Sequence, residues 1–89
     1  MAAISFSQSI RTHVEVPAGE HAGETVRDVL ENVFQDYPRL RSYLLDDRGA
    51  VRKHVSVVVN GSTIRDRERL SDEVTEDAEI FVMQALSGG

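Results

Sequence analysis

Residues 23–38 read GETVRDVLENVFQDYP, and this stretch decides the fold because it contains the clearest helical pattern in the chain. Its apolar residues recur at positions i, i+3, i+4, i+7 and i+8: Val26, Val29, Leu30, Val33 and Phe34. This spacing places them on one stripe of an α-helix, where they can pack against a core. Thr25 is a favourable N-cap residue, Asp28 follows three residues later as in a capping box, and Pro38 interrupts the helix.

Two shorter segments before this helix alternate apolar and polar residues. Residues 3–10, AISFSQSI, set Ile4, Phe6 and Ile10 against serines, and residues 12–19, THVEVPAG, alternate in a similar way. A period of two is the pattern of a strand with one face toward the core and one toward water. The sequence therefore predicts two strands close enough to form a hairpin. The second should end at its proline, which cannot donate a hydrogen bond to a sheet.

The segments after the main helix predict a short second helix and a strand. Residues 38–49, PRLRSYLLDDRG, carry apolar residues on one side, and we expect Gly49 to stop this helix. Residues 54–61, HVSVVVNG, form the strongest predicted strand, and its Asn-Gly end is a strong turn signal. Three of its valines are expected to face the core: Val55, Val57 and Val59.

The rest of the chain predicts a short strand, a charged link and a final strand. The short strand falls within residues 62–66, STIRD, and the link spans residues 67–79, where Leu70 and Val74 should pin it to the core. The final strand is residues 79–86, EIFVMQAL. Strands on both sides of one amphipathic helix favour a mixed sheet with that helix packed across it.

These elements together predict an α+β fold of the ubiquitin-like β-grasp type. A mixed sheet of four or five strands would pack on one main helix, with a short second helix beside it. Residues 1–84 are expected to form this domain, and residues 85–89 a flexible C-terminal tail ending in Gly-Gly.

The composition fits one small globular domain and argues against several classes of protein. The chain has 89 residues, of which 40% are hydrophobic and 28% charged, and it contains no cysteine. A formal net charge of −5 without a basic face argues against nucleic-acid binding. No apolar run approaches the length of a membrane span, and the first residues lack the pattern of a signal peptide. We therefore expect a cytoplasmic protein that binds neither nucleic acid nor membrane.

The sequence offers no catalytic or metal-binding motif. His13, His21 and His54 do not follow the spacing of zinc ligands, so no metal site is expected. There is no Ser-centred elbow, P-loop or dinucleotide-binding glycine motif. Carboxylates are numerous, but none is set in apolar surroundings that would raise its pKa for acid–base catalysis. We therefore expect a protein that is not an enzyme.

Two residues of the final predicted strand indicate a partner surface. If Ile80 and Val82 point into the core, Phe81 and Met83 point outward. An exposed phenylalanine beside an exposed methionine is typical of a protein-binding surface. Leu86 is assigned to the same surface. The alternative is a central strand buried on both faces, in which case Phe81 and Met83 would belong to the core.

The final letters, MQALSGG, indicate a chemical role for the terminal carboxylate. Gly88 and Gly89 have no side chains and Ser87 has a small one, so this segment is expected to thread a narrow channel in another protein. The carboxylate of Gly89 would then reach that protein's active site. Carboxylates are poor electrophiles, so this group would first need conversion to an acyl adenylate with ATP. A thiol or sulfide could then displace AMP.

Two stretches carry a resemblance to a known family: residues 37–61, YPRLRSYLLDDRGAVRKHVSVVVNG, and residues 77–89, DAEIFVMQALSGG. By its element order, its VVVNG strand end, its acidic TEDAEI loop and its Gly-Gly end, the chain resembles the ThiS/MoaD family of ubiquitin-like sulfur carriers. The resemblance covers essentially the whole chain.

The resemblance implies a reaction at Gly89 and a set of partners. An adenylyltransferase related to the ubiquitin-activating enzymes would adenylate Gly89, and a cysteine desulfurase or rhodanese would supply sulfur for a terminal thiocarboxylate. An acceptor synthase would use that sulfur for a cofactor, a thiolated tRNA base or another metabolite. The chain itself would bind no cofactor, because ATP is used by the activating enzyme.

The resemblance also bears on the branch of the family. Met83 stands where the molybdopterin member has an aromatic residue that packs on the activating enzyme. Gln84 and Ala85 stand where that branch usually has a proline pair. The receiving pathway therefore stays open.

Two other functions remain open on the sequence. The chain could be a protein modifier, in which Gly89 is joined to lysines of target proteins through an isopeptide bond. It could also be a β-grasp interaction module whose final glycines have no chemical role.

Overall fold

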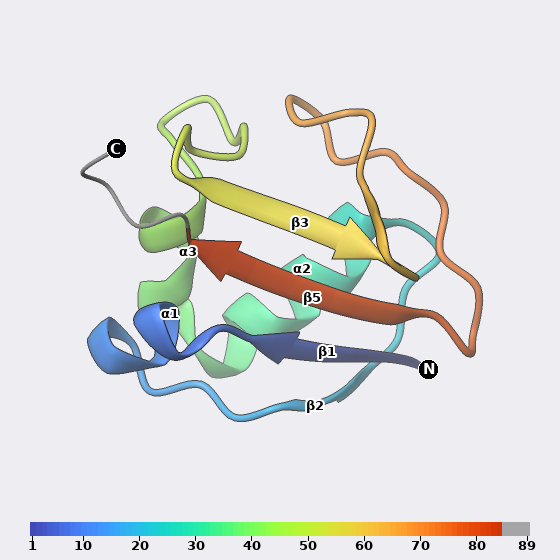
Figure 1. The fold of residues 1–89 in the computed structure, drawn as a ribbon, viewed down its shortest axis with the longest axis horizontal. Coiled ribbons are helices and arrows are strands. Elements are labelled where there is room, and N and C mark those ends of the chain that lie inside the picture. The colour runs from blue at the N-terminus through green and yellow to red at the C-terminus, as the bar shows by residue number, and fades with distance from the viewer. Residues whose placement is uncertain (85–89) are drawn as a thin grey trace.

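The computed structural model describes residues 1–84, which form a five-stranded sheet and three helices (Figure 1). The strands are β1 (Ala2–Phe6), β2 (Gly19–His21), β3 (Val55–Val59), β4 (Ser62–Thr63) and β5 (Glu79–Gln84). The helices are α1 (Gln8–His13), α2 (Val26–Asp36) and α3 (Pro38–Leu44).

The strands follow the order β2-β1-β5-β3-β4, with β5 at the centre of the sheet. β1 and β5 run parallel, with Ile4 opposite Ile80, and the other neighbouring pairs are antiparallel. β5 therefore has a strand on each side from Ile80 to Val82, while its last two residues pair only with β3. Figure 1 shows it ending beside α1 and α3. This mixed sheet with one main helix behind it confirms the predicted α+β β-grasp fold.

Helix α2 forms where its apolar stripe predicts. The Thr25 side-chain oxygen accepts a hydrogen bond of 3.2 Å from the backbone N–H of Asp28, which caps the start of the helix. Pro38 takes the first position of α3, so the chain turns between the two helices. All five residues of the stripe are buried against the sheet: Val26, Val29, Leu30, Val33 and Phe34.

The core lies between α2 and the inner face of the sheet. Val57, Ile80 and Val82 are no more than 2% exposed, and each such side chain stabilises the fold by about 1.5–3 kcal/mol. Leu70 and Val74 are buried as well, so the charged link between β4 and β5 is pinned at the two predicted positions.

The prediction of a second strand within residues 12–19 was wrong. Residues 8–13 form helix α1, and the strand that pairs with β1 is β2, which begins after Pro17. Ile10 is fully buried on α1, four residues after Phe6 at the end of β1. Gln8 occupies the position where a continuing strand needs an apolar residue, and it marks the change to a helix. β2 is antiparallel to β1 as expected, although α1 lies in the connection between them.

Two smaller expectations need adjustment. Val59 is only partly buried, because it ends β3 at the turn, whereas Val55 and Val57 are in the core as predicted. Helix α3 ends at Leu44, before Gly49, which instead adopts a left-handed φ of 82° in the following turn. The predicted short strand and the final strand are confirmed as β4 and β5.

Candidate functional site

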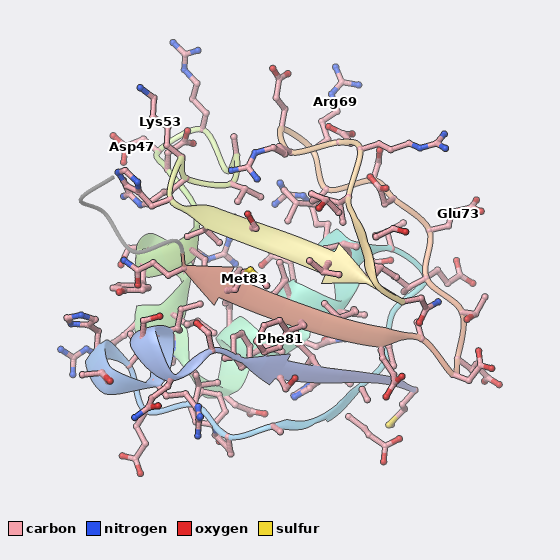
Figure 2. All side chains as sticks on the ribbon, viewed as in Figure 1. Asp47, Lys53, Arg69, Glu73, Phe81 and Met83 are labelled. Carbon is pink, nitrogen blue, oxygen red and sulfur yellow. The ribbon has the colours of Figure 1, made fainter. Side chains whose placement is uncertain are left out.

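The side chains of β5 alternate strictly between core and solvent. Ile80 and Val82 are 2% and 0% exposed, whereas Phe81 and Met83 are 36% and 37% exposed. Figure 2 shows Phe81 and Met83 on the open face of the sheet, the face opposite α2. The outward orientation predicted for these two residues is confirmed, and the alternative of a strand buried on both faces is wrong at these positions.

Small neighbours leave this pair uncovered. Met83 lies opposite Ser56 on β3, and Phe81 lies opposite Val58 on the same strand. On the other side Phe81 lies opposite Ser5 of β1. A serine is too short to cover a phenylalanine or methionine, so the two larger side chains stand above the sheet. We call Phe81 and Met83 the β5 pair.

The end of β5 is bonded to two helices as well as to its neighbouring strands. The backbone N–H of Gln84 donates to the Ser7 hydroxyl oxygen at 3.3 Å. The Tyr43 hydroxyl donates to the Gln84 side-chain oxygen at 2.5 Å. Gln84 also lies opposite Val55 in the β3–β5 register. These contacts set the position of the last described residue before the Gly-Gly segment.

The phenol of Tyr43 is itself held by a second ring. His13 of α1 stacks on Tyr43 of α3, with ring centroids 5.5 Å apart and an interplanar angle of 29°. No sequence pattern predicts this arrangement, because Tyr43 is 41 positions from Gln84 in the chain and Ser7 is 77 positions from it. His13, for which the sequence predicts no metal site, is exposed and stacks on Tyr43.

Two carboxylates with lowered pKa values, Asp46 and Asp66, accept hydrogen bonds from nearby residues in their own loops. Backbone N–H groups of Ala50 and Arg48 lower the pKa of Asp46, and the Ser71 hydroxyl lowers the pKa of Asp66. Such hydrogen bonds favour the ionised carboxylate. A general acid at neutral pH needs the opposite shift, so these carboxylates give the described part of the chain no acid–base site.

The described residues also lack features of other sites. Between residues 1 and 84, no group of three or more histidine, aspartate or glutamate side chains is placed to hold a metal ion. Within the same part of the chain, no helix has the length and apolar character needed to cross a membrane. The predicted roles of Leu86, Ser87, Gly88 and Gly89 fall outside the described residues and stay predictions.

The chain also matches a known protein family over almost its whole length. The ThiS family model matches residues 6–89. The chain belongs to the ThiS family. This confirms the resemblance to ubiquitin-like sulfur carriers, and the match extends from β1 to the Gly-Gly segment. No curated protein sequence matches the chain.

Solved structures share the fold of this ThiS-family chain. A chain of the Amycolatopsis orientalis BexX/CysO complex is 22% identical, with a TM-score of 0.84 and 100% coverage of both chains. Mycobacterium tuberculosis CysO is 18% identical, with a TM-score of 0.82 and coverage of 97% and 100%. The small archaeal modifier protein 1 of Methanosarcina acetivorans is 24% identical, with a TM-score of 0.79 and coverage of 99% and 95%. These similarities confirm the ubiquitin-like β-grasp fold.

Proposed function

We propose that this ThiS-family chain is a sulfur carrier whose Gly89 carboxylate is adenylated and then converted to a thiocarboxylate. The observation that carries the proposal is the family match, which includes Gly88 and Gly89. The geometry of β5 supports it, because the strand displays an apolar pair and ends at Gln84, five residues before Gly89 in the sequence.

The proposed chemistry has two steps. A carboxylate oxygen of Gly89 attacks the α-phosphorus of ATP, which forms the acyl adenylate and releases pyrophosphate. A sulfur nucleophile at the oxidation level of sulfide then attacks the Gly89 carbonyl carbon. The C–S bond forms, the C–O bond to AMP breaks, and AMP leaves. The thiocarboxylate stores sulfur for transfer to a biosynthetic acceptor.

Each predicted residue has a role in this scheme. Ser87 and Gly88 thread the channel of the activating enzyme, because side chains of this size leave the backbone room to pass. The β5 pair and Leu86 dock on that enzyme. The chain is thus a co-substrate that binds no cofactor of its own. Its partners are an adenylyltransferase that uses ATP, a cysteine desulfurase or rhodanese as sulfur donor, and an acceptor synthase, all in the cytoplasm.

The test is reconstitution of the two steps. The chain is incubated with ATP, sulfide and the ubiquitin-activating-enzyme-like adenylyltransferase of the same organism. Intact mass spectrometry should show one oxygen replaced by sulfur, and fragmentation should place the sulfur at Gly89. Deletion of Gly89 should abolish the product while leaving the circular dichroism spectrum unchanged, because the core lies within residues 2–82. Sulfur incorporation that survives this deletion would overturn the proposal.

A matched control separates loss of the tail glycine from loss of any glycine. Gly19 lies on β2, and a Cβ atom added there meets only the His21 side chain, at 3.6 Å. Gly19→Ala should therefore form the thiocarboxylate as well as the wild-type chain does. If Gly19→Ala failed to the same extent as the Gly89 deletion, the defect would lie in the fold and not in the chemistry.

Protein modification is the second proposed function. It is favoured by the fold shared with small archaeal modifier protein 1. Both functions use the same adenylate and differ in the group that attacks it, a lysine amine instead of sulfur. The acyl–nitrogen bond forms as AMP leaves, and the amine loses one proton.

A direct test of modification needs one added cleavage site. The sequence has no lysine or arginine after Arg69, so trypsin would leave a remnant from Leu70 to Gly89 on each target lysine. Ala85→Arg shortens this remnant to Leu-Ser-Gly-Gly and leaves the threading residues unchanged. Leu-Ser-Gly-Gly remnants on lysines of stressed cells that carry Ala85→Arg, and not of cells that also lack Gly89, would support modification. Their absence, with Ala85→Arg still adenylated, would contradict it.

A further inference from the structure

Gln84 is the last described residue before the segment that carries the proposed chemistry, and three separate elements hold it. Ser7 precedes α1, Tyr43 is on α3, and Val55 begins β3. Figure 1 shows α1 and α3 converging where β5 ends. Contacts from these elements constrain the position and orientation of Gln84.

The Ser7 hydroxyl accepts the hydrogen bond that the Gln84 N–H would otherwise donate to a backbone carbonyl oxygen of β1. The Ser7 N–H donates to the Val82 carbonyl oxygen at 2.9 Å, so the β1–β5 ladder continues up to this residue. The Ser7 carbonyl oxygen, which would accept from Gln84 in a continuing parallel ladder, instead accepts from Ile10 and Arg11 of α1. The hydroxyl oxygen takes over and accepts from the Gln84 N–H.

This use of Ser7 is not explained by helix capping. A serine at an N-cap usually accepts a hydrogen bond from its own helix. The Ser7 side chain makes no capping bond to α1. Its hydroxyl accepts from the Gln84 N–H at the end of β5 and also lies 3.3 Å from the Ser9 hydroxyl oxygen. Ser7→Ala would free Gln84 and remove this contact with Ser9, but it would not remove a side-chain cap from the backbone of α1.

Tyr43 holds the side chain of the same residue. Its hydroxyl donates to the Gln84 side-chain oxygen, and the stacked His13 ring restricts where that hydroxyl can lie. Tyr43 is partly buried and packs against the core, so its position follows that of the domain. These contacts therefore tie Gln84 to the same domain that displays the β5 pair.

We infer that Ser7 and Tyr43 are positioning residues that clamp Gln84 and aim the following residues at the channel of the activating enzyme. The inference rests on the proposed function. A tail that already leaves in the required direction loses less conformational freedom on binding. When only a fraction of the molecules is competent to bind, the apparent affinity equals the intrinsic affinity multiplied by that fraction. Loss of the clamp should thus raise KM for the carrier and leave kcat unchanged, because a threaded tail is held by the enzyme.

The experiment measures adenylation of the full chain by pyrophosphate exchange with the activating enzyme. Tyr43→Phe removes the hydroxyl and keeps the ring that stacks on His13. Because one hydrogen bond contributes a net 0.5–1.5 kcal/mol, KM should rise about twofold to tenfold, with kcat changed by less than about twofold. Tyr37→Phe is the matched control. Tyr37 is also partly buried against the core, and within residues 1–84 its hydroxyl has no hydrogen-bond partner.

A double-mutant cycle tests whether Tyr43 acts through Gln84. Gln84→Met keeps the length of the side chain and removes the oxygen that accepts from Tyr43. It should raise KM as Tyr43→Phe does, and the double variant should be no worse than the poorer single variant. Hydrogen exchange gives a direct reading of the other contact, since Ser7→Ala should speed exchange of the Gln84 backbone amide.

The outcomes separate this inference from the proposed function. If the wild-type chain supports pyrophosphate exchange and Tyr43→Phe has the same KM, the clamp is overturned and the carrier function still stands. Additive effects of Tyr43→Phe and Gln84→Met also overturn it, because the two residues would then act independently. No pyrophosphate exchange with the wild-type chain overturns the proposed function and the inference with it.

Discussion

Phe81 on β5 lies directly opposite Ser5 on the parallel strand β1. The ring is 36% exposed even though it belongs to the central strand of the sheet, where both neighbouring strands could have covered it. Met83 has the same relationship with Ser56 on β3. An apolar pair raised above small residues loses much of its contact with water when a flat partner surface meets it. This is the physical basis for assigning the β5 pair to docking.

Met83→Glu should weaken binding to the activating enzyme. Burial of a methionine side chain contributes about 1.5–3 kcal/mol, and a carboxylate in the same place must also be desolvated, so the Kd should rise by at least about tenfold. The fold should be unaffected, because Met83 points away from the core. Isothermal titration of the variant into the enzyme measures the effect.

Glu79→Gln is the control for this substitution. Glu79 is exposed at the start of the same strand, and the change alters its charge without altering the β5 pair. Its Kd should remain close to that of the wild-type chain. Equal affinity of Met83→Glu and wild-type chains would place the docking surface elsewhere.

Glu31 should make stability depend on pH. Hydrogen bonding and charge from Arg41, with a smaller contribution from Arg27, hold the pKa of the Glu31 carboxyl below its ordinary value of 4.5. A carboxyl group with a lowered folded-state pKa adds stability above the unfolded value, and this stability is lost as the pH falls through the folded value. Glu31→Gln should therefore lower the free energy of unfolding near neutral pH. The loss should stay below about 1 kcal/mol, because the ion pairs are partly exposed.

Urea unfolding of both proteins across the acid range measures this dependence. The difference in the free energy of unfolding between wild-type and Glu31→Gln chains should be largest above pH 4.5 and should shrink as the pH falls below that value. Glu76→Gln, which removes an exposed carboxylate from the link before β5, is the control for the loss of one negative charge. A pH-independent difference for Glu31→Gln would show that the ion pairs are not its cause.

The parts of the fold that the sequence predicted are those with one-sided burial. On α2, Val29 and Val33 are about one helical turn apart and both face the core. On β5, Val82 faces the core and the neighbouring Phe81 faces water. In both elements the apolar period equals the geometric period, so the sequence pattern and the structure carry the same information. The orientation of the β5 pair could be predicted for this reason.

The missed elements lack such a pattern. β2 contains Gly19, Glu20 and His21, none of them a typical strand residue, and it pairs with β1 through backbone groups. Val16 is buried although it lies outside any strand. Its apolar side chain completes an alternating sequence pattern that resembles the pattern of a strand. The Gln84 clamp was also missed, because its partners come from elements far apart in the sequence and meet only in the folded chain.

The turn between β3 and β4 should respond strongly to one substitution. Asn60 and Gly61 have φ values of 50° and 86°, which are the left-handed conformations of a type I′ turn. A Cβ atom added at Gly61 meets nothing within 4 Å, so Gly61→Ala should lower the free energy of unfolding through backbone strain alone, by about 1–2 kcal/mol. Gly61→Asn should cost less, because asparagine tolerates this conformation. Urea unfolding measures both variants, with Gly19→Ala as the control. An alanine at Gly61 as stable as the asparagine would show that strain at this turn is not the cause.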